Sequence, residues 1–380
     1  MGNLNPAQGP TIFLFLPSLD GGGAERVFVQ LANEFAMLGV RVHLLLAVAR
    51  GPYLKEVAQG VRIVELGTKG VLRSLARLVS HIRSERPRAV LSALDHSNIV
   101  AILACAIAGS GTRRVISMRS VPSAVYRRER FVRRWVMPFL MRRSYHRANR
   151  IIANSQAVAL DLIANFRVPA EKLSTIYNPL DIGAIERRSR EKVENHWLGE
   201  ESSPVILGVG NLSLLKDFPT LIRAFALVRE KRECRLVILG EGPDRRDLER
   251  LAAELGLNKN VHLPGFVDNP FAWMRLAAVV VSSSLTEGCP NALMQALACG
   301  TAVVSTDCVG GSSEILEGGR WGRLVPVGDP QAMAAAIMAT MAGKDGVDVK
   351  ARAANFAIEE IARKYLQQLI PDLTIPIVER

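Results

Sequence analysis

The chain has 380 residues, more than one hydrophobic core normally serves, so two domains are expected. An apolar share of 49% with 22% charged residues is typical of a globular protein and leaves little room for long disorder. The apolar runs Ile12–Leu16 and Ile99–Ala108 are too short to span a bilayer. The first lacks a basic leader and a small-residue cleavage site, so it is interpreted as a strand and not as a signal peptide.

From residue 11 the chain alternates short apolar runs with longer amphipathic ones, which indicates βαβ units and parallel sheets. In the first half, helices are expected at Ala24–Leu38 and Val71–Ser84. The strands expected there are Ile12–Leu16, Val42–Leu46, Val61–Glu65, Ala89–Ser92, Val115–Ser117 and Arg150–Ala153.

A second series of strands follows a charged stretch, Asp181–Glu201, which lacks strand periodicity and is expected to be a linker or a bridging helix. Apolar residues at helical spacing predict a last helix over Val349–Leu369. The strands expected in the second series are Val205–Val209, Leu236–Leu239, Val261–Leu263, Ala277–Val281 and Ala302–Ser305.

The formal net charge of +12 favours an anionic partner, and much of the excess lies in one stretch between residues 113 and 150 whose only carboxylate is Glu129. Bulky apolar residues such as Phe131, Trp135 and Phe139 are interleaved with its arginines, which suits a membrane interface better than a nucleic-acid groove. An amphipathic helix whose apolar side is simply core is an equally open alternative. The arginines are Arg113, Arg114, Arg119, Arg127, Arg128, Arg130, Arg133, Arg134, Arg142, Arg143, Arg147 and Arg150.

The five cysteines are odd in number and show no Cys-x-x-Cys spacing. We expect them to be reduced and buried, as in a cytoplasmic protein. They are Cys105, Cys234, Cys289, Cys299 and Cys308.

The most informative stretch runs from the strand Ala277–Val281 through a Gly-Pro turn into a helix. Pro290 suits the first helical position and Gly300 the left-handed end of that helix. The backbone N–H groups around Asn291 and Ala292, with the helix dipole, would hold a phosphate. The carboxylate of Glu287 lies in the preceding loop, and Gln295 lies on the same helix face as Asn291. This constellation suits a sugar attached to a diphosphate.

A glycine-rich turn, Gly21–Gly23, follows the first strand and leads into a helix, so it can bring backbone N–H groups close to a phosphate or a sugar. A plain strand-to-helix turn is the alternative. The glycine-rich turn is not the spaced G-x-G-x-x-G of dinucleotide binders, and no acidic residue ends the second strand. A nicotinamide enzyme is therefore not expected.

The chain resembles the retaining glycosyltransferases of family 4, whose hallmark is two glutamates separated by seven residues in a Ser-x-x-Glu-Gly-x-Pro-Asn setting, here Ser284 to Asn291. Each motif alone is weak, but their order and spacing together are specific. The other motifs that carry the resemblance are Gly21–Arg26, Ala148–Ser155, Tyr177–Pro179, Val209–Leu212, Lys216–Phe218, Leu239–Pro243, Pro264–Val267 and Leu324–Asp329.

The resemblance implies an α/β protein of GT-B fold, with two doubly wound Rossmann-like domains facing across a cleft. It implies an acceptor-binding domain over residues 1–185 and a nucleotide-sugar-binding domain over residues 186–355. A C-terminal helix within residues 356–380 would cross back and pack on the first domain.

The resemblance also implies site residues at the loops that follow the strands. Catalytic roles fall to Glu287 on the sugar, to Lys216 on the diphosphate and to His96 as a sugar contact, although a lone histidine is also an ordinary structural residue. Asp95 and Arg119 are expected on the acceptor side. Donor-binding residues are expected at Gly22, Gly23, Gly210, Asn211, Glu241, Phe266, Val267, Gly288, Asn291, Ala292 and Gln295.

Two positions depart from the family pattern. Gln295 replaces the second hallmark glutamate, which in relatives holds the nucleotide ribose, and Asn211 replaces an arginine beside the diphosphate. A glutamine carbonyl still accepts a hydrogen bond from a hydroxyl, so weaker donor binding is expected. The alternative to donor binding is a tight-turn role for Glu241, and it is ordinary packing for Phe266 and Val267.

The implied reaction is transfer of a sugar with retention from a nucleotide sugar, most commonly a UDP-sugar and next a GDP-mannose, to a lipid-linked or polysaccharide acceptor. No cofactor is expected. No metal is expected either, because no Asp-x-Asp appears and Lys216 with helix N-termini can neutralise the diphosphate. The expected location is the inner face of the cell membrane, held there by residues 127–143. The alternatives are a nucleotide-sugar-binding protein with weakened catalysis and, less favoured, a nucleic-acid-binding protein.

Overall fold

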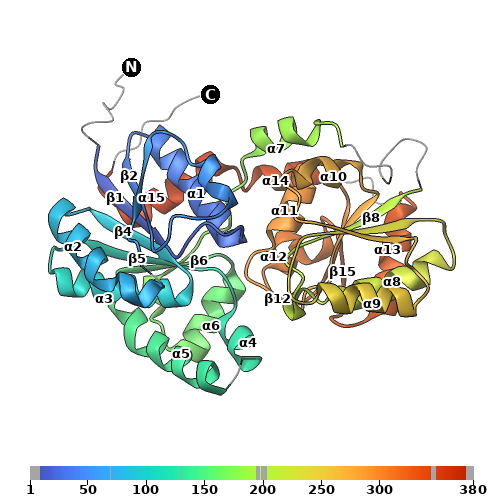
Figure 1. Ribbon diagram of the computed structural model, residues 1–380, viewed down its shortest axis with the longest axis horizontal. Coiled ribbons are helices and arrows are strands. Elements are labelled where there is room, and N and C mark those ends of the chain that lie inside the picture. Colours follow the sequence, from blue (N-terminus) through green and yellow to red (C-terminus); the bar gives the residue numbers. More distant parts are fainter. Residues whose placement is uncertain are drawn as a thin grey trace. The chain divides into compact units, whose positions relative to one another are not determined.

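The chain folds into two compact α/β units, shown in a computed structural model in Figure 1. Unit 1 comprises residues 1–179 and 358–380, and unit 2 comprises residues 180–357. The residues described are 9–68, 70–129, 131–193, 197, 203–343 and 348–373. No helix in these ranges combines the length and the apolar character needed to cross a membrane.

Unit 1 is built on a parallel sheet with the strand order β3-β2-β1-β4-β5-β6-β7. The order reverses at β1, as in doubly wound folds, because each strand connects to the next through a helical crossover. The strands are β1 (Thr11–Leu16), β2 (Arg41–Leu46), β3 (Val61–Glu65), β4 (Ala89–Ala93), β5 (Arg113–Met118), β6 (Arg150–Ala153) and β7 (Leu173–Thr175).

Both faces of this sheet are covered by helices, and the alternation along β1 shows it. Ile12, Leu14 and Leu16 belong to one core cluster with α1 and α15, while Phe13 and Phe15 belong to another with α2 and α3. The helices of unit 1 are α1 (Gly23–Met37), α2 (Leu75–Glu85), α3 (Asp95–Ala108), α4 (Pro122–Arg127), α5 (Phe131–Ser144), α6 (Gln156–Phe166) and α15 (Ile358–Leu369), with short 3-10 helices at Pro52–Glu56, Val71–Ser74, Tyr145–Arg147 and Ala170–Lys172.

Unit 2 is a second parallel sheet with the order β10-β9-β8-β11-β13-β15. Its strands are β8 (Val205–Val209), β9 (Arg235–Leu239), β10 (Val261–Gly265), β11 (Val279–Ser282), β13 (Val303–Thr306) and β15 (Arg323–Val325), and the pair β12 (Thr286–Glu287) and β14 (Val309–Gly310) forms a small separate sheet.

The helices of unit 2 flank its sheet, with α8, α9 and α13 in one core cluster with β8, β9 and β11 (Figure 1). They are α7 (Ile182–Ser189), α8 (Phe218–Arg229), α9 (Arg245–Glu254), α10 (Pro270–Leu276), α11 (Asn291–Ala298), α12 (Ser312–Ile315), α13 (Pro330–Met341) and α14 (Val349–Ala354), with 3-10 helices at Leu214–Lys216 and Glu317–Gly319. The two doubly wound α/β units confirm the expected fold class.

The chain passes between the units at two points that lie side by side in unit 2. The Leu180 N–H donates to the Phe356 carbonyl at 2.7 Å, and Leu180 forms a parallel bridge with Ala357. The expected boundary at residue 185 falls inside α7, whose residues all belong to unit 2, so the division lies instead after Pro179. The charged stretch from Asp181 is thus a helix as far as Ser189, and the rest of it lies largely outside the described residues.

The single last helix expected over Val349–Leu369 is wrong. It is two helices, α14 and α15, which are separated at residues 355–357 and belong to different units. The side chain of Arg352 anchors the end of α14 by donating to the carbonyls of Glu314 and Ile315 at 2.9 and 2.8 Å. The second helix returns to unit 1, where Ile361, Tyr365 and Leu366 are buried in its core, as the resemblance implied.

Candidate functional site

The loop after β8, residues 210–217, is hydrogen-bonded to the loops on both sides of it at the carboxyl edge of the unit 2 sheet. The Leu212 N–H donates to the Glu241 carbonyl at 2.9 Å, and the Leu285 N–H donates to the Leu215 carbonyl at 2.8 Å. One strand further, the Gly240 N–H donates to the Gly265 carbonyl at 2.8 Å. Four loops are therefore held together by backbone bonds, at the edge where doubly wound sheets bind ligands.

Two glycines allow neighbouring backbone segments to approach closely at this edge. Gly240 has φ +140° and lies so near Gly210 that a Cβ atom would overlap the Gly210 carbonyl oxygen. Gly310 has φ +136°, and its Cβ would overlap the carbonyl oxygen of Glu287. Both positions need glycine for conformation and for space.

The central contact of the site joins Lys216 and Glu287. The Lys216 Nζ atom forms an ion pair with Glu287 Oε1, which also accepts a hydrogen bond from Ser284 Oγ at 2.7 Å. The Glu287 side chain is 12% exposed and the Lys216 side chain 27%. A cation and a carboxylate thus meet near the surface, with the carboxylate held by a buried hydroxyl.

Lys216 is positioned by its backbone. Its carbonyl accepts from Ser283 Oγ at 2.7 Å, which ties the 3-10 turn Leu214–Lys216 to the loop after β11. The next residue, Asp217, has φ +45° and starts α8, where its carboxylate accepts from Thr220 Oγ1 at 2.7 Å. A non-glycine residue in the left-handed region is uncommon, and here it turns the chain sharply after the lysine.

Glu287 is positioned by a short strand and not by an open loop. With Thr286 it forms β12, which pairs in parallel with β14 at Val309 and Gly310. Thr286 Oγ1 adds a hydrogen bond to the Val309 carbonyl at 2.8 Å. Reasoning from the sequence missed Gly310 and Thr286, and only the β-branched residues at 286 and 309 hint at the pairing.

The helix after Glu287 begins one residue later than expected. Pro290 is the N-cap, with extended φ and ψ, and α11 runs from Asn291 to Ala298. Gly300 follows with φ +79°, which is the predicted left-handed end. Asn291, Ala292 and Gln295 are all half-buried, so the first turns of α11 keep accessible polar groups.

The other expected donor contacts surround this centre in unit 2. Gly210 and Asn211 open the central loop, and Asn211 is exposed. The exposed Glu241 forms an ion pair with Arg245 at 2.6 Å. Phe266 is 50% exposed directly after Gly265, whereas Val267 is half-buried. Gly288, next to Glu287, is buried.

In unit 1 the glycine turn already holds a carboxylate. Gly22 is the N-cap of α1 and Gly23 its first residue, and the Glu25 carboxylate lies so close that a Cβ at Gly22 would overlap it. Burial raises the pKa of Glu25, and the nearby Asp20 raises it further, against the lowering effects of its own backbone N–H and of Arg119. Sequence reasoning missed Glu25, although it stands within the glycine motif.

Asp95 does not offer a free carboxylate to an acceptor. Its Oδ2 accepts from the Tyr126 hydroxyl, and Oδ1 accepts from the Tyr145 hydroxyl at 3.5 Å, so it links α4 and the turn after α5 to the start of α3. Burial raises the pKa of Asp95, against the lowering effect of these bonds. The residue before it, Leu94, has φ +72°, a strained conformation that turns the chain from β4 into α3. His96 follows as an exposed side chain.

Arg119 lies at the end of β5, at the same sheet edge of unit 1. Its Nη1 donates weakly to Ser117 Oγ at 3.5 Å and to the Tyr365 hydroxyl at 3.4 Å. Its buried Nε atom has no hydrogen-bond partner among the described residues. Among the described residues, the guanidinium is thus held only by these two long hydrogen bonds.

All five cysteines are buried and none forms a disulfide. Burial raises the pKa of Cys105 and Cys299 to about 12, so these two thiols are poor nucleophiles at neutral pH. Across the described ranges no group of three or more His, Cys, Asp or Glu residues is arranged to hold a metal ion.

Comparisons with known proteins agree with this architecture. The profile of "Glycosyltransferase Family 4" matches residues 21–183, and that of "Glycosyl transferases group 1" matches residues 203–342. One relative is a Campylobacter jejuni N-acetylgalactosamine-N,N'-diacetylbacillosaminyl-diphospho-undecaprenol 4-alpha-N-acetylgalactosaminyltransferase, 31% identical over 94% of this chain and 98% of its own. Another is the Rhizobium meliloti lipopolysaccharide core biosynthesis glycosyltransferase LpsE, 25% identical over 94% of this chain and 96% of its own.

Solved structures share the fold. Anabaena Alr3699/HepE in complex with UDP-glucose superposes with a TM-score of 0.79 at 22% identity, covering 94% of this chain and 99% of that one. TarM superposes with a TM-score of 0.76 at 13% identity, covering 96% and 100%. The two parallel sheets are those of a GT-B glycosyltransferase. Within that class, the chain belongs to glycosyltransferase family 4.

Proposed function

We propose that this enzyme transfers a sugar, with retention, from a UDP-sugar to a lipid-linked or polysaccharide acceptor in cell-envelope glycan synthesis. The observation that carries the proposal is the ion pair between Lys216 and Glu287 ahead of α11. The two side chains in this contact supply a cation for the leaving diphosphate and a carboxylate for the sugar.

The chemistry follows from the charges that develop. Breaking a glycosyl–phosphate bond leaves negative charge on the diphosphate, which Lys216 and the N-terminus of α11 stabilise. Positive charge grows at the anomeric carbon, and Glu287, freed from Lys216, faces it or binds the sugar hydroxyls. In front-face substitution the acceptor oxygen bonds to the anomeric carbon as the phosphate oxygen departs on the same side. That departing oxygen takes the acceptor proton.

UDP is the proposed nucleotide because the structural neighbour Alr3699/HepE was solved with UDP and with UDP-glucose. Phe266, 50% exposed after Gly265, offers a ring to the base, and Gln295 offers an amide to the ribose. Loss of the second hallmark glutamate makes that ribose contact weaker than in relatives, since a carboxylate accepts the stronger hydrogen bond.

No metal is part of the proposal. The positive groups that would act on the diphosphate are Lys216, which lies at the site, and the backbone N–H groups that begin α11. Asn211 replaces a second cation, so Lys216 is expected to contribute most of the side-chain charge.

A lipid-linked acceptor is supported by the names of two relatives, which describe an undecaprenol diphosphate acceptor and lipopolysaccharide core synthesis. Helix α5 supports it independently. Phe131, Trp135 and Phe139 stand four residues apart on one face and are 78%, 62% and 62% exposed, while Met141 is buried. The rings are thus not the core face of the helix, and exposed arginines surround them.

These side chains suit the interface of an anionic membrane, with the rings at headgroup depth and the guanidinium groups on lipid phosphates. We therefore place the enzyme on the inner face of the cell membrane through residues 127–143. Nucleic-acid binding is disfavoured because exposed leucine and valine accompany the rings, notably Val136 and Leu140.

A calorimetric screen tests the proposal. Wild-type protein is titrated with UDP-, GDP-, ADP- and dTDP-sugars and, as a control for basic surface, with a single-stranded oligonucleotide. Binding of a UDP-sugar and none of the oligonucleotide is expected. Binding of the oligonucleotide alone would contradict it, and donor binding without transfer to any membrane-extracted acceptor would favour a nucleotide-sugar-binding protein.

A further inference from the structure

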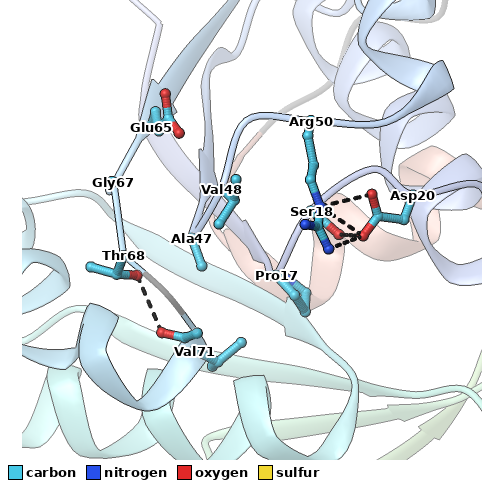
Figure 2. A pocket seen from close by; sticks show the side chains of 11 residues that line it. Pro17, Ser18, Asp20, Ala47, Val48, Arg50, Glu65, Gly67, Thr68 and Val71 are labelled. Carbon is cyan, nitrogen blue, oxygen red and sulfur yellow. Dashed lines mark hydrogen bonds and ion pairs between the residues drawn. The ribbon is translucent and has the colours of Figure 1, made fainter.

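A pocket of about 640 Å³ opens at the carboxyl edge of unit 1, beside the glycine turn, and none of the site residues predicted from the sequence lines it (Figure 2). Loops that continue β1, β2 and β3 line it. Its volume lies within the range of small-ligand sites. It shares the β1–α1 connection with Gly22 and Gly23, because Pro17, Ser18 and Asp20 belong to its wall.

The pocket is preformed by backbone bonds. Pairing continues beyond the strands, since the Val48 N–H donates to the Pro17 carbonyl at 3.0 Å and the Thr68 N–H to the Ala47 carbonyl at 3.0 Å. The Leu19 N–H donates to the Arg50 carbonyl at 2.9 Å, and Gly51, with φ +113°, has no room for a Cβ beside Leu19. The loops therefore do not need to fold around a ligand.

Its polar groups are held in fixed positions (Figure 2). The Arg50 guanidinium donates to both carboxylate oxygens of Asp20 at 3.0 to 3.2 Å, and Ser18 Oγ donates to Asp20 Oδ2 at 2.7 Å. Burial alone would raise the pKa of Asp20, but the bonds from Arg50 and Ser18 outweigh it and lower the pKa. Asp20 is thus ionised at neutral pH.

A second carboxylate and a hydroxyl lie across the pocket. Glu65 Oε1 accepts from the Ala49 N–H at 3.2 Å, which leaves this carboxylate further acceptor capacity. The Thr68 hydroxyl pairs with Ser74 Oγ at 2.7 Å. Apolar surface between the polar groups comes from Pro17, Val48 and Val71.

The charges of the pocket select the class of ligand. The pocket is lined by two carboxylates, Asp20 and Glu65, and by one guanidinium, that of Arg50, in a chain of formal net charge +12. This arrangement disfavours a phosphate and favours hydroxyl groups, which donate charge-assisted hydrogen bonds to carboxylates. The apolar wall suits the C–H face of a sugar ring.

We infer that this pocket binds an uncharged sugar ring of the acceptor glycan, next to the residue that receives the transferred sugar. The inference rests on the proposed function and adds to it a specificity site in unit 1. The phosphates of a lipid-linked acceptor are excluded from this pocket and belong with the arginine-rich segment instead. Asp20 and Glu65 bind the sugar ring and take no part in making or breaking bonds.

The first test is saturation-transfer NMR with methyl α-glycosides of glucose, galactose, N-acetylglucosamine and N-acetylgalactosamine, with inorganic phosphate as the charged probe. Asp20→Asn, Glu65→Gln and Thr68→Val alter the pocket with little change in size. Asp372→Asn is the matched control, because its ion pair with Arg88 lies near the amino-terminal edge of the same sheet. Melting temperatures verify that all variants fold.

We expect at least one glycoside to give a signal with wild type and with Asp372→Asn that falls about fivefold or more in the carboxylate variants. Absence of binding to wild type, equal signals in all variants, or loss of phosphate binding in the pocket variants would each overturn the inference.

Steady-state kinetics separates the inference from the proposed function. Where wild type transfers sugar, Glu65→Gln should raise KM for the acceptor about tenfold or more, since a hydrogen bond to a charged group is lost, and leave KM for the donor unchanged. An active enzyme with unchanged acceptor KM in all pocket variants would contradict the pocket and leave the function standing. A wild type with no transfer would contradict the function, while the glycoside signals still decide on the pocket.

Discussion

Lys216 and Glu287 stand 71 residues apart in the chain and form an ion pair at the carboxyl edge of one sheet. The pairing neutralises both groups before any ligand is bound. In the proposed mechanism, a diphosphate that attracts Lys216 would also free Glu287, so that donor binding and preparation of the carboxylate would be a single event. This coupling leads to the first prediction.

Removing the hydroxyl that holds Glu287 should lower kcat without unfolding the protein. Ser284→Ala deletes the 2.7 Å bond to Glu287 Oε1, and a bond of this kind contributes roughly 1 to 3 kcal/mol, so kcat should fall about tenfold. Ser305→Ala is the control, because this buried hydroxyl donates to the Thr306 carbonyl at 3.0 Å and not to Glu287. Equal kcat values for the two variants would show that Ser284 does not position the carboxylate.

Alanine at Gly240 or Gly310 should destabilise the protein by about 2 kcal/mol or more, since each combines positive φ with overlap on a carbonyl oxygen. Gly70→Ala is matched in φ, at +141°, but its Cβ would meet no atom within 4 Å. It should cost about 1 kcal/mol, from backbone strain alone. Chemical denaturation measures the difference, and a Gly70 variant as unstable as the other two would contradict the steric argument.

The buried carboxyl of Asp95 should make stability fall as pH rises. Its pKa is raised in the folded state, so the folded protein binds more protons than the unfolded chain between the ordinary value of 3.8 and the raised one. Unfolding free energy therefore decreases through that window and is highest below it. Asp95→Asn, which keeps an acceptor for Tyr126, should flatten this slope. The difference between wild-type and variant melting temperatures across pH 4 to 8 measures it, and a difference that grows with pH in favour of wild type would have the wrong sign.

Charge reversal beside α5 should release the protein from anionic vesicles. Each basic residue near such a surface contributes about 1 kcal/mol, so changing Arg127, Arg128, Arg133 and Arg134 to glutamate should weaken binding at least about a hundredfold at low salt. Donor affinity should stay unchanged, since none of the proposed donor contacts lies within residues 127–143. The control carries the same change of charge at exposed positions elsewhere, namely Arg73, Arg86, Arg187 and Arg246. Equal sedimentation of both variants with vesicles would exclude a specific membrane-binding helix.

The sequence predicted the buried strands well because parallel strands covered on both faces are continuous apolar runs, as in Leu236–Leu239. The strands missed were Leu173–Thr175 and Arg323–Val325, which are short edge strands with polar residues, and the two-residue pair Thr286–Glu287 and Val309–Gly310. The break at residues 355–357 was missed because apolar residues continue at helical spacing across it. The helices α14 and α15 are separate because the chain passes there from unit 2 to unit 1.

Within the site, residue types and spacing identified Lys216 and Glu287 separately but not their pairing, which depends on β8 and β11 being neighbours. Asp95 was expected to face an acceptor, yet its partners Tyr126 and Tyr145 come from α4 and from the turn after α5, which local patterns do not connect to it. The pocket around Asp20 and Glu65 was not predicted at all, because its residues belong to three loops without a shared motif.

The central claim is that Lys216 acts on the diphosphate and Glu287 on the sugar of one donor. Calorimetric titration of UDP and of the UDP-sugar selected by the screen, into wild type, Lys216→Met and Glu287→Gln, tests it directly. Lys216→Met should weaken both ligands about tenfold. Glu287→Gln should weaken only the UDP-sugar and leave UDP as tight as before or tighter. Equal loss of UDP and UDP-sugar affinity in Glu287→Gln, or unchanged UDP affinity in Lys216→Met, would contradict the account.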